Sequence, residues 1–155
     1  MSDRLSVYSK GMKYTRRGLG EKLSALLALA AAGAAKAQSP AVASKAFVYE
    51  DLPVKVNGAN KQRAVLKGDT HSGYRIELHL TELGPGMAPH PPHKHVHEEM
   101  LMLQDGVLDV TINGQMTHLT AGSVAYVASN ELHGWRNPGP GHAQYFVIAL
   151  GTDNS

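Results

Sequence analysis

The feature that most constrains the fold is a succession of short strand-like runs, separated by turn residues at intervals of about ten residues. Residues 75–81 alternate strictly between apolar and polar side chains, as a half-buried strand does. Residues 107–112 and 115–119 are joined by Asn113-Gly114, a strong hairpin signal because both residue types tolerate positive φ. No window shows a convincing helical period, so the sequence predicts an all-β sandwich or small barrel.

Further strands are expected at residues 47–49, 63–67, 99–103, 123–127 and 143–150. The run 99–103 is apolar on both faces after its first residue, which suggests a strand covered on both sides. Met100 and Met102 lie on the face opposite Leu101 and would need a cover of their own. We therefore expect a homodimer.

The N-terminal 37 residues have the features of an export signal. Arg16 and Arg17 precede the apolar run 23–32, and Ala35-Lys36-Ala37 forms a small-x-small cleavage site. The run is shorter than the roughly 20 apolar residues that span a bilayer. Residues 1–37 resemble a twin-arginine signal peptide, with Leu19 where Phe is common. The alternative is an N-terminal helix that stays attached as an anchor.

The export interpretation divides the chain into a signal peptide (1–37), a flexible Ser/Ala/Pro-rich lead-in (38–46) and one domain (47–151). It predicts a periplasmic or secreted protein without stable membrane insertion after cleavage. The formal charge of +2 then becomes −3, because the signal holds seven of the fifteen basic residues and only two of the thirteen acidic ones. A mature chain of this charge has no basic groove, so nucleic acid is not expected as a partner. The absence of cysteine excludes disulfides and thiolate-bound metals.

Residues 90–99 hold four of the nine histidines, together with Glu98 and Glu99. Imidazole and carboxylate are the ligand set of divalent Mn, Fe, Ni, Cu or Zn. His93 and His95 are two residues apart, so their side chains share one face of an extended segment. A second group, Gly122, His133 and Asn137, follows downstream.

These two groups resemble the motifs of the cupin superfamily. The first motif is matched by Gly86, His93, His95, Glu99 and Gly106, with an opening spacer one residue longer than the commonest form. The second is matched by Gly122, His133 and Asn137, while Ala128 and Asn130 replace a Pro and a Gly. Asn130 can still adopt a left-handed turn. The resemblance covers residues 74–150, and its short spacing between motifs is similar to that of compact bacterial single-domain cupins.

The resemblance implies a double-stranded β-helix, or jelly-roll barrel, whose metal ligands are His93, His95, Glu99 and His133. Four ligands would leave two adjacent octahedral positions for water, dioxygen or a chelating substrate. The alternative is a cupin that keeps its histidines without metal, as some sugar epimerases of the family do.

Other residues are assigned lesser roles. We expect His97 to face solvent or to orient a ligand, His90 to lie at the mouth of the site, and Glu98 to be solvated. His79 is a weak pocket candidate, and His71, His118 and His142 are expected on the surface. The residues expected to line the pocket are Leu101, Tyr126, Trp135 and one of Tyr145 or Phe146, with the alternative that each fills the core.

Two functional classes follow. The first is a metal-dependent enzyme, dioxygenase-like or decarboxylase-like, that acts on a small oxygenated compound chelating the metal. The second is a non-catalytic periplasmic protein that binds a metal or a small ligand. No general base is evident beside the motif, so no catalytic side chain is assigned apart from the metal. Export of the folded protein would allow metal loading before exposure to competing copper and zinc.

Overall fold

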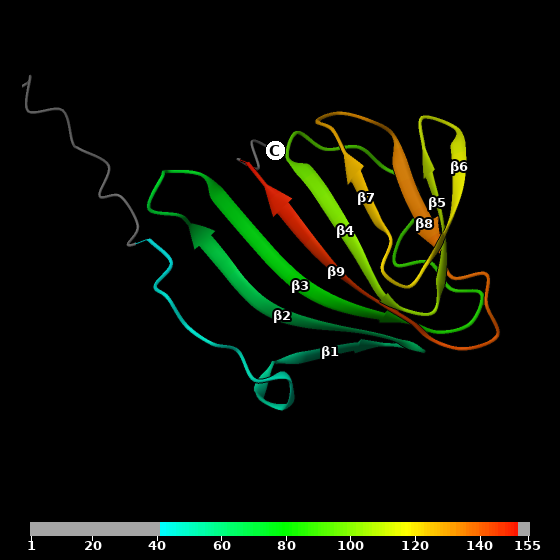
Figure 1. Cartoon of the computed structure of the whole chain (residues 1–155), viewed down its shortest axis with the longest axis horizontal. Coiled ribbons are helices and arrows are strands. Elements are labelled where there is room, and N and C mark those ends of the chain that lie inside the picture. Colours follow the sequence, from blue (N-terminus) through cyan, green and yellow to red (C-terminus); the bar gives the residue numbers. More distant parts are fainter. Residues whose placement is uncertain (1–40, 152–155) are drawn as a thin grey trace, which may run out of the picture. The chain divides into compact units, whose positions relative to one another are not determined.

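The computed structural model describes residues 41–151, which fold into two antiparallel sheets (Figure 1). The expected signal peptide and the first residues of the lead-in lie outside the described residues. The elements are η1 (Tyr49–Asp51), β1 (Val54–Asn57), β2 (Asn60–Asp69), β3 (Arg75–Leu83), β4 (Glu98–Asp105), β5 (Val107–Ile112), β6 (Gln115–Thr120), β7 (Val124–Val127), β8 (His133–Arg136) and β9 (Ala143–Leu150).

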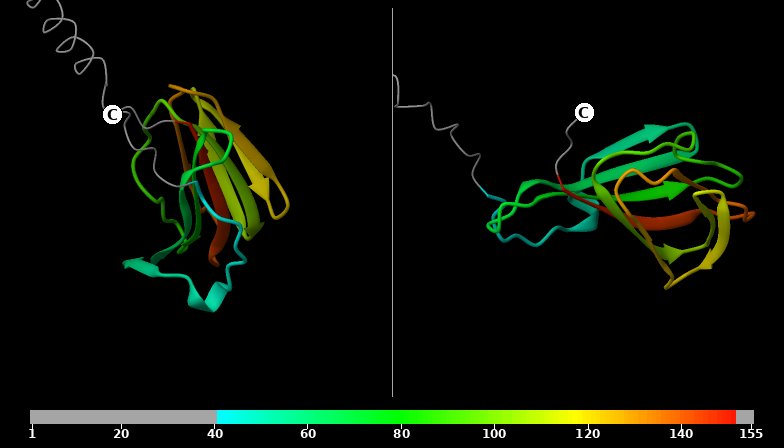
Figure 2. Two further views of the ribbon diagram at one scale, coloured as in Figure 1. Left: turned by 90° about the vertical axis from the view of Figure 1, so that its left-hand side faces the viewer. Right: turned by 90° about the horizontal axis from the view of Figure 1, so that it is seen from above.

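The larger sheet has the order β1-β2-β3-β9-β4-β7, and the smaller sheet has the order β6-β5-β8. Two further views show strands of the C-terminal half, coloured yellow to orange, curling over the green and red strands of the larger sheet (Figure 2). The buried core is formed by side chains of both sheets, namely Leu83, Leu101, Leu103, Leu108, Val110, Leu119, Trp135, Ala143, Tyr145 and Val147. The all-β prediction is therefore confirmed.

Two turns bear out the local chemistry of the sequence. Asn113 and Gly114 have φ of 48° and 82°, and Ile112 pairs with Gln115, so β5 and β6 form the expected two-residue hairpin. Gly106, between β4 and β5, has φ of 80°. A Cβ at Gly106 would lie 2.5 Å from the carbonyl oxygen of His142, so the turn needs glycine for both space and conformation.

Most of the expected strands are found, with two differences. Residues 47–49 were expected to form a strand, but Tyr49–Asp51 form a 3-10 turn and the strand begins only at Val54, after Pro53. The short strand β8 was not expected, because four residues that include Gly134 carry little strand signal of their own. The hydrogen-bonded pairing with β5 stabilises this strand, which its local sequence alone does not predict.

The outer surface of β4 is less covered than its sequence suggested. Leu101 and Leu103 are buried, whereas Met100 and Met102 are half-buried on the opposite face of the strand.

At the start of the described chain, the backbone N–H of Val42 donates to the carbonyl oxygen of Asp69 at 2.8 Å. Within residues 41–151, no helix is long and apolar enough to cross a membrane.

Candidate metal centre

The histidine-rich loop between β3 and β4 is held against β8 by main-chain hydrogen bonds. His93 and His133 form an isolated antiparallel bridge, each donating its N–H to the other's carbonyl oxygen at 2.9 Å. The N–H of Asn130 donates to the carbonyl oxygen of His95 at 2.7 Å. Asn130 has φ of 62°, so it takes the left-handed conformation expected of it. The backbone therefore brings the two motifs together.

Three histidines of this region converge. One ring nitrogen of each of His93, His95 and His133 lies within 4.8 Å of those of the other two. Glu99, at the start of β4, has Oε2 3.2 Å from His133 Nε2 and Oε1 3.5 Å from His95 Nε2. The structure thus groups the four residues that the resemblance implied as ligands.

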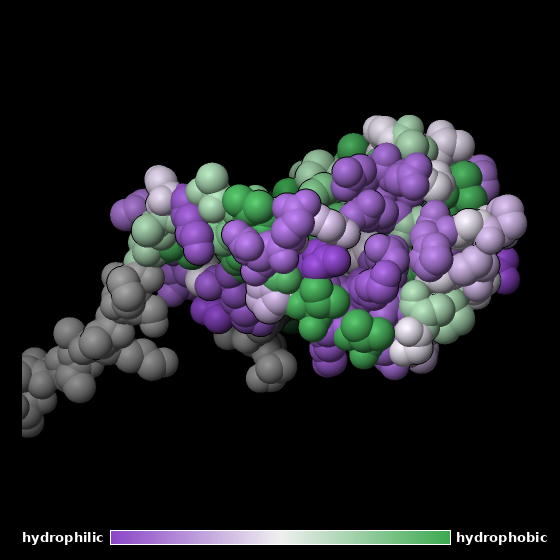
Figure 3. All heavy atoms as spheres, turned by 90° about the horizontal axis from the view of Figure 1, so that it is seen from below, coloured by the Kyte–Doolittle hydropathy of each residue, from purple (hydrophilic) through white to green (hydrophobic). Residues whose placement is uncertain are grey.

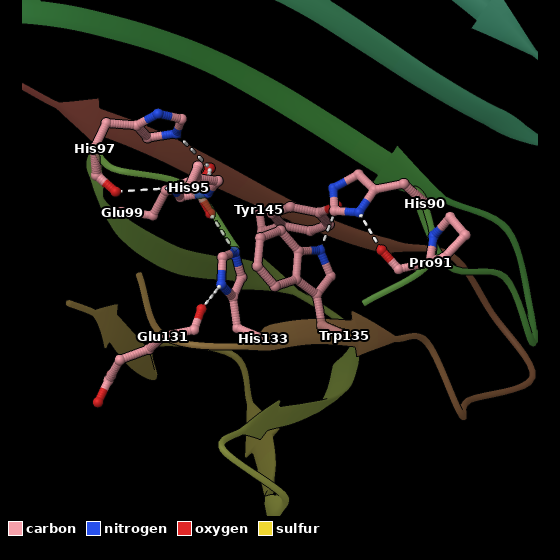
Figure 4. A network of polar contacts seen from close by, with 9 residues as sticks. All are labelled: His90, Pro91, His95, His97, Glu99, Glu131, His133, Trp135 and Tyr145. Carbon is pink, nitrogen blue, oxygen red and sulfur yellow. Dashed lines mark hydrogen bonds and ion pairs between the residues drawn. The ribbon is translucent and has the colours of Figure 1, made fainter. Parts of the chain in front are cut away.

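Two backbone carbonyls determine which ring nitrogens face this cluster (Figure 4). A carbonyl can only accept a hydrogen bond, so His95 Nδ1 donates to the oxygen of His97, and His133 Nδ1 donates to that of Glu131, both at 2.8 Å. A neutral imidazole with its proton on Nδ1 carries its lone pair on Nε2. In their neutral form, both Nε2 atoms therefore present lone pairs toward the Glu99 carboxylate.

The resulting cluster is rich in acceptors and poor in donors. His95 Nε2, His133 Nε2 and Glu99 Oε2 are buried and have no hydrogen-bond partner. Buried polar atoms are normally satisfied, and several acceptors that face each other are mutually repulsive. A divalent cation would neutralise this arrangement, and imidazole with carboxylate is a suitable donor set for it. The residues present fit a metal ion.

The electrostatics of His93 point the same way. Burial, assisted by the neighbouring histidines, lowers the pKa of His93 to about 4. A histidine with this pKa is neutral at physiological pH. Its Nδ1 is also buried without a hydrogen-bond partner. Neutral imidazole is the form that binds metals.

His97 lies closer to the cluster than the sequence analysis expected. Its ring stacks on that of His95, with centroids 3.5 Å apart and planes at 9°, and its Nε2 lies 3.6 Å from Glu99 Oε1. His95, His97 and Glu99 form a second group of atoms spaced for a metal ion. The side chain is 18% exposed, so the solvent-facing alternative is wrong. Its main-chain carbonyl oxygen accepts the hydrogen bond from His95 Nδ1, a contact that does not involve the His97 imidazole. Its parity with His93 and His95 was the signal that could have identified it as a donor.

A cavity of about 250 Å³ adjoins the cluster and is lined by Glu99, His90, Trp135 and Tyr145 among others. Trp135 Nε1 donates to Tyr145 Oη at 2.8 Å, and burial raises the pKa of the Tyr145 hydroxyl. Trp135 and Tyr145 line this cavity and also belong to the buried core, whereas Leu101 belongs to the core without lining the cavity.

Tyr126 is a correction to the expected pocket. Its side chain is 51% exposed, and a hydrogen bond with Glu98 raises its pKa. Tyr126 pairs with Met100 across β4 and β7, so it shares the outer face of Met100 and not the core face of Leu101. Glu98 is exposed, as expected.

The remaining histidines divide into two kinds. The ring of His90 lies edge-on to that of His93, with centroids 4.2 Å apart, and His90 lines the cavity beside the metal cluster. His79 lines the same cavity, and burial lowers its pKa. His71, His118 and His142 are exposed, as expected.

The fold and the cluster together define a small all-β barrel with a histidine-rich cup. Residues 79–149 match the model of the cupin domain. Solved structures with the same fold include a RmlC-like cupin from Shewanella frigidimarina (19% identity, TM-score 0.59, covering 72% of this chain and 95% of that chain). The polyketide cyclase RemF from Streptomyces resistomycificus is 17% identical, with TM-score 0.61 and coverages of 73% and 83%. A predicted oxalate decarboxylase from Thermotoga maritima is 15% identical, with TM-score 0.59 and coverages of 70% and 100%.

No curated protein matches the sequence. The family model matches residues 79–149 and the structural neighbours share this architecture, so the jelly-roll cupin barrel is confirmed as the fold of this chain.

Proposed function

We propose that this cupin is an exported, metal-dependent enzyme that acts on a small oxygenated organic compound. The observation that carries the proposal is the convergence of His95 Nε2, His133 Nε2 and Glu99 Oε2, three buried acceptors without a hydrogen-bond donor. Such a set is costly unless a cation binds it. His93 adds a neutral nitrogen to the same group.

A divalent ion held by His93, His95, Glu99 and His133 would supply Lewis-acid or redox chemistry to a bound substrate. The protein's own residues would orient the metal ligands and enclose the substrate. The carbonyls of His97 and Glu131 hold two ligand rings in one tautomer, which keeps their lone pairs directed inward. Trp135 and Tyr145, joined by a hydrogen bond, form an aromatic wall of the adjoining cavity.

The printed descriptions of two structural neighbours support a small oxygenated substrate. The Thermotoga protein is described as a predicted oxalate decarboxylase and RemF as a polyketide cyclase. Both descriptions concern oxygen-rich organic compounds. We propose a dioxygenase-like or decarboxylase-like reaction.

Export is the second part of the proposal and rests on the sequence of residues 1–37. Replacing both Arg16 and Arg17 by Lys should retain the protein in the cytoplasm if it uses the twin-arginine route. Fractionation of cells that express each form measures this directly. Normal export of the Lys-Lys form would contradict the twin-arginine route.

The activity is tested on mature protein purified from its exporting host. Metal content is measured first, and then oxygen uptake and carbon dioxide release with a panel of small carboxylates and phenols. Turnover that the His133→Ala variant loses, together with its metal, supports a metal-dependent enzyme. Stoichiometric metal without turnover on any compound of the panel would favour the non-catalytic binding protein.

A further inference from the structure

The 250 Å³ cavity beside the metal cluster has an unusual lining on the side of the β1–β2 hairpin. This hairpin contributes Lys55, Asn57, Asn60 and Gln62 to the lining, besides Lys61. The volume equals that of about eight liquid water molecules at roughly 30 Å³ each, so it suits a compound of a few carbon atoms.

The pairing of the hairpin shows that its cavity-lining polar residues share one face, on which Asn60 is buried and the other three side chains are exposed. Lys55 pairs with Gln62 and Asn57 with Asn60, so these four side chains share one face. Val54 and Val56 alternate with them and lie on the other face, where they are 45% and 63% exposed. A strand that covers a packed core has the opposite arrangement. The cavity is therefore bordered by solvent-accessible polar side chains on this side, which suits a polar ligand.

The outward face of the same region is correspondingly apolar. Tyr49 is exposed on the same side as these valines, because Arg63, which pairs with Val54, lies over its ring at 4.3 Å from the centroid. A view from below, toward the side on which β1 and η1 lie, shows green apolar residues among purple polar ones (Figure 3). The inverted hairpin therefore places apolar side chains in solvent while it keeps Lys55 at the cavity.

The charges of the lining are unbalanced. Lys61 forms an ion pair with Glu82 at 2.9 Å, which compensates its charge. Lys55 forms no ion pair within the described part of the chain. Glu99 is the one carboxylate among the lining residues, and it already faces His95 and His133. A divalent ion at that cluster would make the cavity more positive still.

We propose that the cavity takes a small organic carboxylate, whose charged group pairs with Lys55 and accepts hydrogen bonds from the amides of Asn57 and Gln62. Its other end lies toward Glu99, beside Trp135 and Tyr145. This assignment rests on the proposed function and specifies its substrate class. Lys55 is the residue that selects an anion over a neutral compound of the same shape.

The chain contains a built-in reporter, because its single tryptophan, Trp135, lines this cavity. Tryptophan fluorescence is therefore followed while pyruvate or its neutral amide, pyruvamide, is titrated into the mature protein as purified from its exporting host. The two compounds have similar shapes and differ in charge. We expect pyruvate to bind at least about tenfold more tightly, the usual scale of a hydrogen-bonded charge pair.

The Lys55→Gln variant should lose this preference, whereas Lys94→Gln should keep it. Lys94 lies between two proposed ligands but outside the lining, so its replacement makes the same charge change without altering the cavity. Equal binding of both compounds by the unaltered protein would overturn the proposal, as would an unchanged preference in Lys55→Gln or an equal loss in Lys94→Gln. The metal content of the same samples tests the proposed function separately. Absence of metal would refute that function, while the anion preference is judged by the two titrations.

Discussion

His93 and His133 belong to separate sequence motifs, yet each accepts the other's backbone N–H at 2.9 Å. This bridge links the loop before β4 to the first residue of β8. Because the bonds are between main-chain atoms, the spacing of the two imidazoles does not depend on the side chains themselves. Replacing a proposed ligand should therefore remove a donor and leave the scaffold folded.

The turn at Gly106 gives a test of the fold that is independent of the metal. Gly106→Ala should lower the free energy of unfolding by more than about 3 kcal/mol, because it combines a left-handed conformation, worth about 1–2 kcal/mol, with a Cβ 2.5 Å from a carbonyl oxygen. Gly114→Ala is the matched control, since Gly114 has φ of 82° and nothing within 4 Å of the added Cβ. Denaturant titration measures both variants. Equal losses would show that the contact with His142 is unimportant.

The hydrogen bond between Trp135 and Tyr145 should contribute to the stability of the cavity wall. Trp135→Phe removes the Nε1–H donor and leaves the buried Tyr145 hydroxyl with only its hydrogen bond to Thr81, at a cost of about 1 kcal/mol. A double-mutant cycle with Tyr145→Phe separates this bond from the loss of ring volume. We expect a coupling energy of about 1 kcal/mol. A coupling near zero would mean that water replaces the bond.

The lowered pKa of His93 predicts a pH dependence of stability in the metal-free protein. The pKa is about 4 in the folded state and 6.5 for an unperturbed histidine, so between these values the unfolded state binds more protons. The stability should be complete above pH 6.5 and decline as the pH falls toward 4. Thermal melts across this range measure it. His93→Asn should flatten the profile relative to His71→Asn, a change at an exposed histidine, and an equal slope in both variants would contradict the assignment.

His97 should strengthen metal binding without being essential to it. Its Nε2 lies 3.6 Å from Glu99 Oε1, and its ring supports that of His95. His97→Ala should weaken metal affinity by about 10- to 100-fold, the usual effect of a residue that orients a ligand. Competition with a metal-binding dye measures the affinity. A loss as large as that of His133→Ala would make His97 a ligand of equal rank.

Much of the architecture could be predicted from the sequence because its signals are local. Asn113-Gly114 specifies its hairpin through backbone conformation alone, and both residues have the expected positive φ. The two motifs predicted that the histidine-rich loop and His133 lie together, and the fold brings these distant segments into contact. Each of these signals can be recognised in the sequence without information on tertiary contacts.

The wrong predictions concerned residues whose position depends on strand pairing, and a single sequence does not determine which strands pair. Tyr126 was assigned to the pocket, but its pairing with Met100 places it on the outer face. Alternation tells which residues share a face, and the partner strand decides which face is inside. β1 was not predicted as a strand, so the face of β1 that lines the cavity was not predicted either.

The central claim is that His93, His95, Glu99 and His133 hold one divalent ion. The most direct measurement is the metal content per chain of the mature protein and of its His133→Ala variant, with His118→Ala as the control at an exposed histidine. The account predicts one ion per chain in the unaltered protein and in His118→Ala, and none in a folded His133→Ala. Stoichiometric metal in His133→Ala would contradict it.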